Sequence, residues 1–150
     1  MGYGLGAAIG SVIATGERTV LFTGDGSLGM NLNELATAVT YGLPIVIVLR
    51  NNGVLGMVRQ WQTLFYEQRY SNTELNRKTD FVKVSEGFGA KAKRVWTAEE
   101  FETVFQEAIR GNEPYLIEVM IDKDELVLPM LPPGGTVDEI IVSKEQENEG

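Results

Sequence analysis

The apolar run PIVIVL at residues 44–49 constrains the fold of this chain more than any other segment. No polar residue alternates with the apolar ones, so a strand formed here must be covered on both faces, as the strands of a parallel sheet are. TVLFT at residues 19–23 is interpreted as a short buried strand, and YLIEVMI at 115–121 as the last strand. AKRV at residues 92–95 is interpreted as one more short strand.

Helical patterns alternate with these strands. Residues 2–16 are mostly small, which predicts a helix in very close contact with its neighbours. Residues 31–41 are expected to form one helix, which Asn31 caps with Glu34 three positions later. Further helices are expected over residues 54–67, around 80–89 and from the capping box Thr97–Glu100 onward. This order predicts an α/β fold with a doubly wound, mostly parallel sheet.

The chain is interpreted as one domain over residues 1–142, followed by a disordered acidic tail over residues 143–150. Its first residues already belong to a glycine-rich element, and no strand precedes them. We therefore expect the fold to be incomplete at its N-terminus, with the first part of the domain elsewhere.

Composition excludes several classes of function. A net charge of −8 argues against a nucleic-acid or anionic-membrane partner, and no apolar run is long enough to span a bilayer. Without a recognisable signal peptide, a cytoplasmic location is expected. The chain has no cysteine and no histidine, which excludes disulfides, thiolate or imidazole metal sites and a Ser-His-Asp triad. Its chemistry must use carboxylates, amides, backbone groups or a cofactor.

A glycine motif follows the first strand. Gly24, Gly26 and Gly29 form G-x-G-x-x-G, which is the dinucleotide-binding pattern, but Asp25 would place a negative charge beside a pyrophosphate. The pair Asn51-Asn52 follows the next strand, with 24 residues between Gly26 and Asn51. In open α/β sheets ligands bind beyond the carboxyl ends of the strands, so these two segments are expected at the same edge.

The residue types at this edge favour a magnesium-bridged diphosphate. The carboxylate of Asp25 and the amide oxygen of Asn52 are ligands that suit Mg²⁺ or Ca²⁺. The backbone N–H groups of Gly26 and Ser27 are free to meet a phosphate at a helix N-terminus. A metal between Asp25 and the phosphate removes the repulsion.

Two other interpretations remain open at this point. A dinucleotide-binding module would carry an acidic residue at the end of the second strand, where this chain has Arg50, Asn51 and Asn52, although Arg50 could suit a 2′-phosphate. The motifs could also be ordinary turns, or belong to a scaffold whose site has decayed, but the intact Asp25 and Asn52 speak against decay.

The GDG motif, the 24-residue spacing and the NN pair resemble the cofactor motif of thiamine diphosphate enzymes. The segments MGYGLGAAIG (1–10), LGMVRQWQ (55–62) and LPMLPPGG (128–135) resemble the large catalytic subunit of the acetolactate synthase family more closely, over most of residues 1–142. A pyruvate oxidase or a 2-keto acid decarboxylase is the alternative within the thiamine diphosphate enzymes.

The resemblance implies a role for particular residues. The implied metal ligands are Asp25, Asn52 and the backbone carbonyl of Val54. The diphosphate is implied to meet Gly26 and Ser27. Met1 is implied to lie under the cofactor and to hold it bent. The segment that lines the diphosphate and thiazolium side is Asn52, Gly53, Val54, Leu55, Gly56 and Met57. Met57 and Trp61 are implied to lie near the substrate, and Pro132, Pro133 and Gly134 belong to a segment that folds over the site.

The resemblance also implies an activity and partners. The family condenses pyruvate with pyruvate or with 2-ketobutyrate, with loss of CO₂, in the biosynthesis of valine, leucine and isoleucine. The glutamate that activates the cofactor comes from another domain on the partner subunit, and a middle domain binds FAD. No residue here matches that glutamate, since Glu34 fits better as a helix cap, so we expect this chain alone to be inactive. A homodimer or higher oligomer and a regulatory small subunit are the implied partners.

Overall fold

A parallel sheet forms the centre of the structure, a computed structural model that describes residues 1–143. Among these residues the sheet has four strands in the order β1-β2-β4-β3, and every neighbouring pair is parallel. The strands are β1 Thr19–Gly24, β2 Ile45–Asn51, β3 Lys91–Val95 and β4 Tyr115–Met120. Apart from Ser143, the tail that was expected to be disordered lies outside the described residues.

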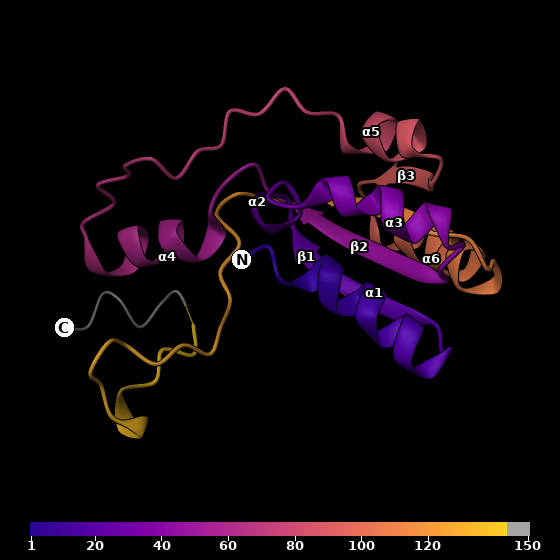
Figure 1. The fold of residues 1–150 in the computed structure, drawn as a ribbon. Helices are drawn as coiled ribbons and strands as arrows, with labels where there is room; N and C mark the ends of the chain where they lie inside the picture. The colour runs from indigo at the N-terminus through magenta and orange to yellow at the C-terminus, as the bar shows by residue number, and fades with distance from the viewer. Residues whose placement is uncertain (144–150) are drawn as a thin grey trace.

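Helices cover both faces of this sheet, as Figure 1 shows. One face packs against α1 Gly4–Thr15, α3 Leu35–Thr40 and α5 Phe81–Phe88, and the other packs against α6 Ala98–Arg110. The remaining elements are α2 Asp25–Leu28, α4 Gly56–Phe65 and the short 3-10 helices η1 Leu32–Glu34 and η2 Val137–Glu139. The doubly wound α/β fold is therefore confirmed, and no helix within residues 1–143 has the length and hydropathy to cross a bilayer.

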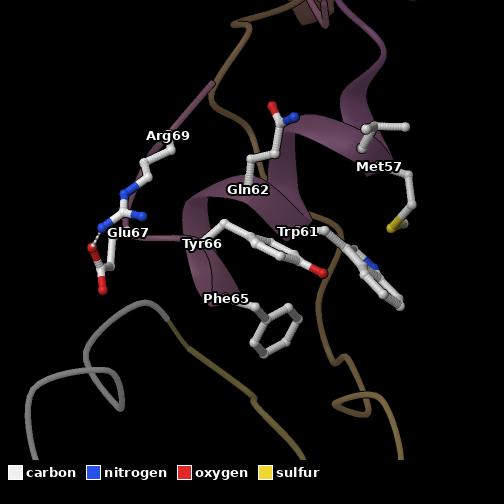
Figure 2. Close-up of a pocket in the computed structure, with 8 residues that line it drawn as sticks. Met57, Trp61, Gln62, Phe65, Tyr66, Glu67 and Arg69 are labelled. Carbon is white, nitrogen blue, oxygen red and sulfur yellow. Dashed lines mark hydrogen bonds and ion pairs between the residues drawn. The ribbon is translucent and has the colours of Figure 1, made fainter. Parts of the chain in front are cut away.

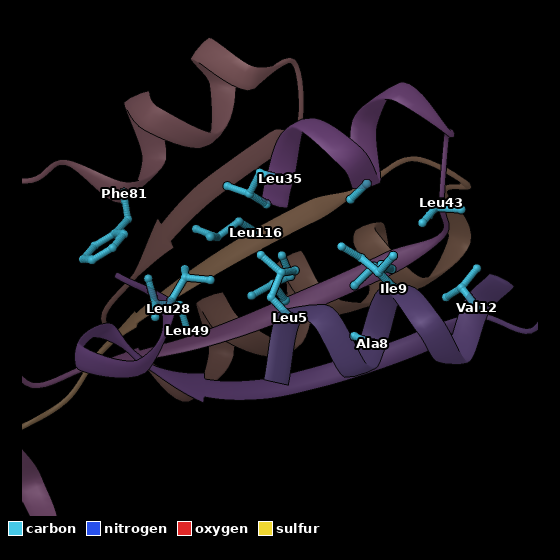
Figure 3. Close-up of a cluster of buried hydrophobic side chains, with 13 residues drawn as sticks. Leu5, Ala8, Ile9, Val12, Leu28, Leu35, Leu43, Leu49, Phe81 and Leu116 are labelled. Carbon is cyan, nitrogen blue, oxygen red and sulfur yellow. The ribbon is translucent and has the colours of Figure 1, made fainter. Parts of the chain in front are cut away.

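The strand β2 is covered on both faces, as its apolar sequence predicts. All side chains from Ile45 to Leu49 are at most 2% exposed. Ile45, Ile47 and Leu49 pack with α1 and α3, while Val46 and Val48 pack with α6 on the opposite face. Figure 3 shows the first of these clusters, in which side chains of α1, α3 and α5 meet the sheet.

The close contact predicted for the first helix is also confirmed. A Cβ atom at Gly4 would lie only 2.9 Å from Cδ1 of Leu21 on β1, so α1 approaches the sheet at a distance that favours glycine. The capping box of α6 is present as predicted, with Thr97 and Glu100 hydrogen-bonded reciprocally.

The prediction that β1 is buried is wrong. Phe22 is 58% exposed and Val20 is 37% exposed, because β1 is the edge strand and α6 packs against β3 and β4 rather than against it. One face of β1 is therefore apolar and uncovered among the described residues.

The helix predicted over residues 31–41 is present over residues 32–40, but its first turn is a 3-10 helix and the predicted Asn31 cap is wrong. Asn31 makes no side-chain cap, because its Nδ2 donates a hydrogen bond to the carbonyl of Gly2 at 2.6 Å. The chain instead forms η1, and α3 begins only at Leu35. The carboxylate of Glu34 accepts from the Thr37 hydroxyl at 3.0 Å.

Ile47→Ala is expected to lower the free energy of unfolding by about 2–5 kcal/mol, because it leaves a cavity at a fully buried position. Val20→Ala on the paired edge strand serves as the control, with an expected loss below about 1 kcal/mol. Urea unfolding of both variants measures the difference, and equal losses would contradict the burial of β2.

Candidate metal and cofactor site

The register of β1 and β2 brings two loops together. Gly24 lies opposite Arg50 in the parallel pair, so Asp25 and Asn51 leave the sheet side by side at its carboxyl edge. Asp25, Asn52 and Val54 line the same pocket, which has a volume of about 310 Å³. The charged side chains around this pocket are those of Asp25, Glu74, Arg77 and Lys123.

Asp25 carries a buried carboxylate at this pocket. The residue is 3% exposed, and this burial raises the pKa of its carboxyl group above the ordinary value. A hydrogen bond from the Gly26 backbone and the charge of Arg77 act against that rise, while the charge of Glu118 adds to it. A buried carboxylate at the wall of a pocket is stabilised by a cation, so its chemistry suits a metal ion.

Two successive side-chain turns shape the loop after β2. Oδ1 of Asn51 accepts from the N–H of Gly53 at 3.1 Å, and Oδ1 of Asn52 accepts from the N–H of Val54 at 3.2 Å. Asparagine favours such turns because its amide oxygen reaches the backbone two residues further on. Gly53 has φ of 68°, a conformation that glycine adopts without strain. The amide oxygen of Asn52 keeps a second lone pair for a further ligand.

The carbonyl of Val54 is directed by the strand pairing around it. Val54 lies opposite Glu74 in an antiparallel bridge, whose hydrogen bonds run from Leu55 N–H to the Thr73 carbonyl (2.8 Å) and from Leu75 N–H to the Gly53 carbonyl (2.9 Å). Because these bonds belong to the neighbours of Val54, its own N–H and C=O point away from residues 73–75. Its N–H meets Asn52, so its C=O lies on that side too.

The pocket therefore combines a carboxylate, an amide oxygen and a backbone carbonyl, all of them hard oxygen donors. Among residues 1–143 there is no cluster of three or more acidic, histidine or cysteine side chains that could hold a metal. Mg²⁺ is commonly bound by one or two carboxylates together with substrate phosphates, so the donor set suits a cation that an anionic ligand also binds.

The N-terminal residues are fixed beside α2. The N–H of Gly2 donates to Oγ of Ser27 at 2.9 Å, and its carbonyl accepts from Asn31. These bonds bring Met1 to Gly26, where a Cβ atom would lie 3.2 Å from Cε of Met1 and 3.1 Å from Cδ2 of Leu55. The Ser27 hydroxyl is thus engaged by the chain itself. Its backbone N–H lies in the first turn of α2, where helices leave N–H groups without a helical acceptor.

Met57 and Trp61 lie in a different pocket. They are four residues apart on α4 and line an open, mostly apolar hollow of about 590 Å³. Figure 2 shows both side chains on the same side of the helix, with Trp61 in edge-to-face contact with Phe65 at 5.8 Å between ring centroids. The structure separates these residues from the pocket around Asp25 and does not bring the two sets into one cavity.

The sequence analysis missed two buried polar residues that hold α4 in place. Arg59 is 6% exposed, donates from Nε to Asp124 at 2.7 Å and places its guanidinium 3.9 Å from the ring centroid of Tyr70. Gln60 is 2% exposed and exchanges two hydrogen bonds with the backbone of Val127, at 2.8 and 3.0 Å. A periodic pattern of apolar residues cannot reveal such anchors, because both side chains are polar.

Gly29 leaves space for a side chain from a distant segment. A Cβ atom there would lie 1.9 Å from Nη1 of Arg77, so Gly29 makes room for this guanidinium rather than for helix packing alone. Nη1 of Arg77 also donates to the Asp25 carbonyl at 2.8 Å. Pro132, Pro133 and Gly134 form a turn between Met130 and Ile141, which pair with each other in the segment after β4.

Arg59→Met is expected to speed amide hydrogen exchange in α4 about tenfold or more, because it removes a charged hydrogen bond and a cation–π contact that together exceed about 1.4 kcal/mol. Arg69→Met is the matched control, since Arg69 pairs with Glu67 in water, where ion pairs contribute little. Equal exchange rates in the two variants would show that Arg59 does not anchor the helix.

Comparisons with known proteins find relatives over nearly the whole chain. The family model described as "Thiamine pyrophosphate enzyme, C-terminal TPP binding domain" matches residues 1–119. The chain is 46% identical to a probable acetolactate synthase large subunit of Methanocaldococcus jannaschii, covering 94% of this chain and 24% of that protein. It is 44% identical to the acetolactate synthase large subunit of Haemophilus influenzae, covering 98% of this chain and 26% of that protein.

Two further comparisons concern a eukaryotic relative and a solved structure. The identity to the mitochondrial acetolactate synthase catalytic subunit of Saccharomyces cerevisiae is 47%, covering 94% of this chain and 20% of that protein. A solved structure of a thiamine diphosphate-dependent 4-hydroxybenzoylformate decarboxylase from Rhodococcus jostii RHA1 superposes with a TM-score of 0.75 at 33% identity, covering 81% of this chain and 23% of that one. The chain thus spans about a quarter of the length of the curated relatives it matches.

Proposed function

Because this chain belongs to the family of C-terminal TPP-binding domains of thiamine pyrophosphate enzymes, we propose that it is the cofactor-binding part of an acetolactate synthase large subunit. The curated relatives that carry this name are 41–47% identical over nearly the whole chain. The decarboxylase structure is 33% identical, which supports the synthase over the decarboxylase alternative. Two observations disfavour the dinucleotide-binding alternative. The family model is that of a TPP-binding domain, and the end of β2 carries Asn51-Asn52 instead of an acidic residue.

The proposal assigns the metal to Asp25, Asn52 and the Val54 carbonyl, with Mg²⁺ as the ion. The observation that supports it is that Asp25, Asn52 and Val54 line one pocket at the carboxyl edge of β1 and β2. The burial of Asp25 supports a cation there, because a carboxylate at 3% exposure is costly and its pKa stays raised despite Arg77 and the Gly26 hydrogen bond.

The cofactor itself supplies the electron sink for cleavage next to a carbonyl group, and the protein binds and orients it. Gly26 and the backbone of Ser27 are proposed to meet the diphosphate, with Gly53, Leu55 and Gly56 along its side. The approach of Met1 to Gly26 and Leu55 supports a place for Met1 beneath the cofactor. Met57 and Trp61, on the exposed face of α4, are proposed to meet the substrate.

The activity of the complete protein, the natural polypeptide in which these residues occur, belongs to the same proposal. In this proposal the complete protein condenses pyruvate with pyruvate or with 2-ketobutyrate, in the biosynthesis of branched-chain amino acids. FAD, a homo-oligomeric partner and a regulatory small subunit are proposed through the resemblance alone. A cytoplasmic location stays a prediction, and the yeast relative is named as mitochondrial.

Asp25→Asn in the complete protein is expected to weaken Mg²⁺-dependent binding of thiamine diphosphate about a hundredfold, because it removes the charged ligand from a buried cation site. Calorimetric titration of the cofactor at several Mg²⁺ concentrations measures this change. Asp138→Asn, at an exposed position of η2, is the control. An unchanged Mg²⁺ dependence in Asp25→Asn would rule out the ligand assignment.

Trp61→Leu is expected to change the ratio of products formed from mixed pyruvate and 2-ketobutyrate more than it changes cofactor affinity, because Trp61 lies on α4 away from the metal pocket. A severalfold change is expected, since one altered apolar contact contributes about 1–3 kcal/mol to discrimination. Trp96→Leu, at the other tryptophan, controls for loss of an exposed indole.

The products of the unaltered complete protein test the class of reaction. An aldehyde as the main product from pyruvate would favour the decarboxylase alternative.

A further inference from the structure

A buried carboxylate lies behind the loop that follows β2. Glu118 belongs to β4 and is 1% exposed, so it is a charged residue in the interior of an otherwise apolar strand. A carboxylate at this depth requires hydrogen bonds to both of its oxygens, because burial of an unpaired charge costs several kcal/mol.

Two donors satisfy Glu118 from opposite sides. Nε of Arg94 on β3 donates to Oε2 at 2.7 Å, and Nδ2 of Asn51 donates to Oε1 at 2.7 Å. Arg94 in turn donates from Nη2 to Asp80 at 3.0 Å, and its hydrogen bond to Glu118 raises the pKa of the guanidinium further above its ordinary value. Each oxygen of Glu118 thus accepts one hydrogen bond, and the one that Arg94 leaves free accepts from Asn51.

Asn51 connects this ion pair to the loop. Its Nδ2 is held by Glu118, its Oδ1 accepts from the N–H of Gly53, and its backbone carbonyl accepts from the N–H of Ile121 at 3.0 Å. With three groups bound, neither the side chain nor the backbone of Asn51 can rotate freely. Asn52, Gly53 and Val54 follow directly in the chain, and all three line the pocket.

We propose that Glu118 is a positioning residue of the metal site, which acts through Asn51 to hold the Asn52 amide and the Val54 carbonyl in the geometry that Mg²⁺ requires. This inference rests on the proposed function, since it concerns the same cation. Mg²⁺ demands near-ideal octahedral coordination, whereas Ca²⁺ accepts irregular and larger coordination shells. Loss of an outer partner that orients a ligand typically weakens metal affinity about 10- to 100-fold.

A purely structural role makes a different prediction. If Glu118 only joined β3 to β4 through Arg94, its loss would reduce stability and leave the preference for Mg²⁺ over Ca²⁺ unchanged. Asn51→Ser separates the two roles, because it removes the donor to Glu118 but leaves the Arg94–Glu118 pair intact. The serine hydroxyl can still accept from the N–H of Gly53.

The test uses the complete protein with Asn51→Ser, Glu118→Gln and the double substitution. Thiamine diphosphate binding is followed by tryptophan fluorescence during titration with Mg²⁺ or with Ca²⁺. Each single variant should need about tenfold more Mg²⁺ for half-saturation, with a smaller change for Ca²⁺. The double variant should need no more than the weaker single variant, because both changes break the same contact.

Glu107→Gln is the matched control, since Glu107 on α6 bonds Lys93 and Tyr115 far from the loop, and it should leave both titrations unchanged. The inference is overturned if Asn51→Ser binds Mg²⁺ within twofold of the unaltered protein, or if the two single effects add. If the Glu118→Gln variant does not fold, the Mg²⁺ and Ca²⁺ titrations of Asn51→Ser alone test the inference. Absence of Mg²⁺-dependent binding in the unaltered protein would instead overturn the proposed function, and this inference with it.

Discussion

The parallel pairing of β1 with β2 is the contact on which the whole candidate site depends. Gly24 opposite Arg50 places Asp25 beside Asn51 and Asn52, and a shift of one residue would turn every side chain of β2 to the wrong face. That shift is opposed because it would move the exposed, charged Arg50 into the fully buried position of Leu49. The hydrophobic core therefore sets the geometry of a polar site that it does not itself contain.

Buried charge is concentrated around that site. Asp25 and Glu118 are both almost completely buried. Arg94 donates to the carboxylate of Glu118, whereas Arg77 donates to the backbone carbonyl of Asp25 and acts on its carboxylate through charge alone. Burial is the main cause that raises the pKa of Asp25, and the negative charge of Glu118 adds to it. A divalent cation beside Asp25, as proposed, would offset the negative charge that the two carboxylates place near this edge of the sheet.

The sequence predicts the features that depend on neighbouring residues and on the spacing between motifs. PIVIVL indicates a strand covered on both faces, and the spacing from GDG to NN places two loops at one edge, as the structure has them. It does not predict contacts between distant residues. Asn31 binds Gly2 instead of capping a helix, Phe22 lies exposed on an edge strand, and the partners of Glu118 and Arg59 are 67 and 65 residues away in the chain.

In the proposed site, one divalent cation binds between the loops that follow β1 and β2. Anomalous diffraction from crystals of the complete protein grown with Mn²⁺ and thiamine diphosphate tests it most directly, because Mn²⁺ shares the oxygen ligands of Mg²⁺. A single strong peak about 2 Å from the Asp25 carboxylate, the Asn52 amide oxygen and the Val54 carbonyl is the predicted result. A peak elsewhere, with these three oxygens unbound, would contradict the account.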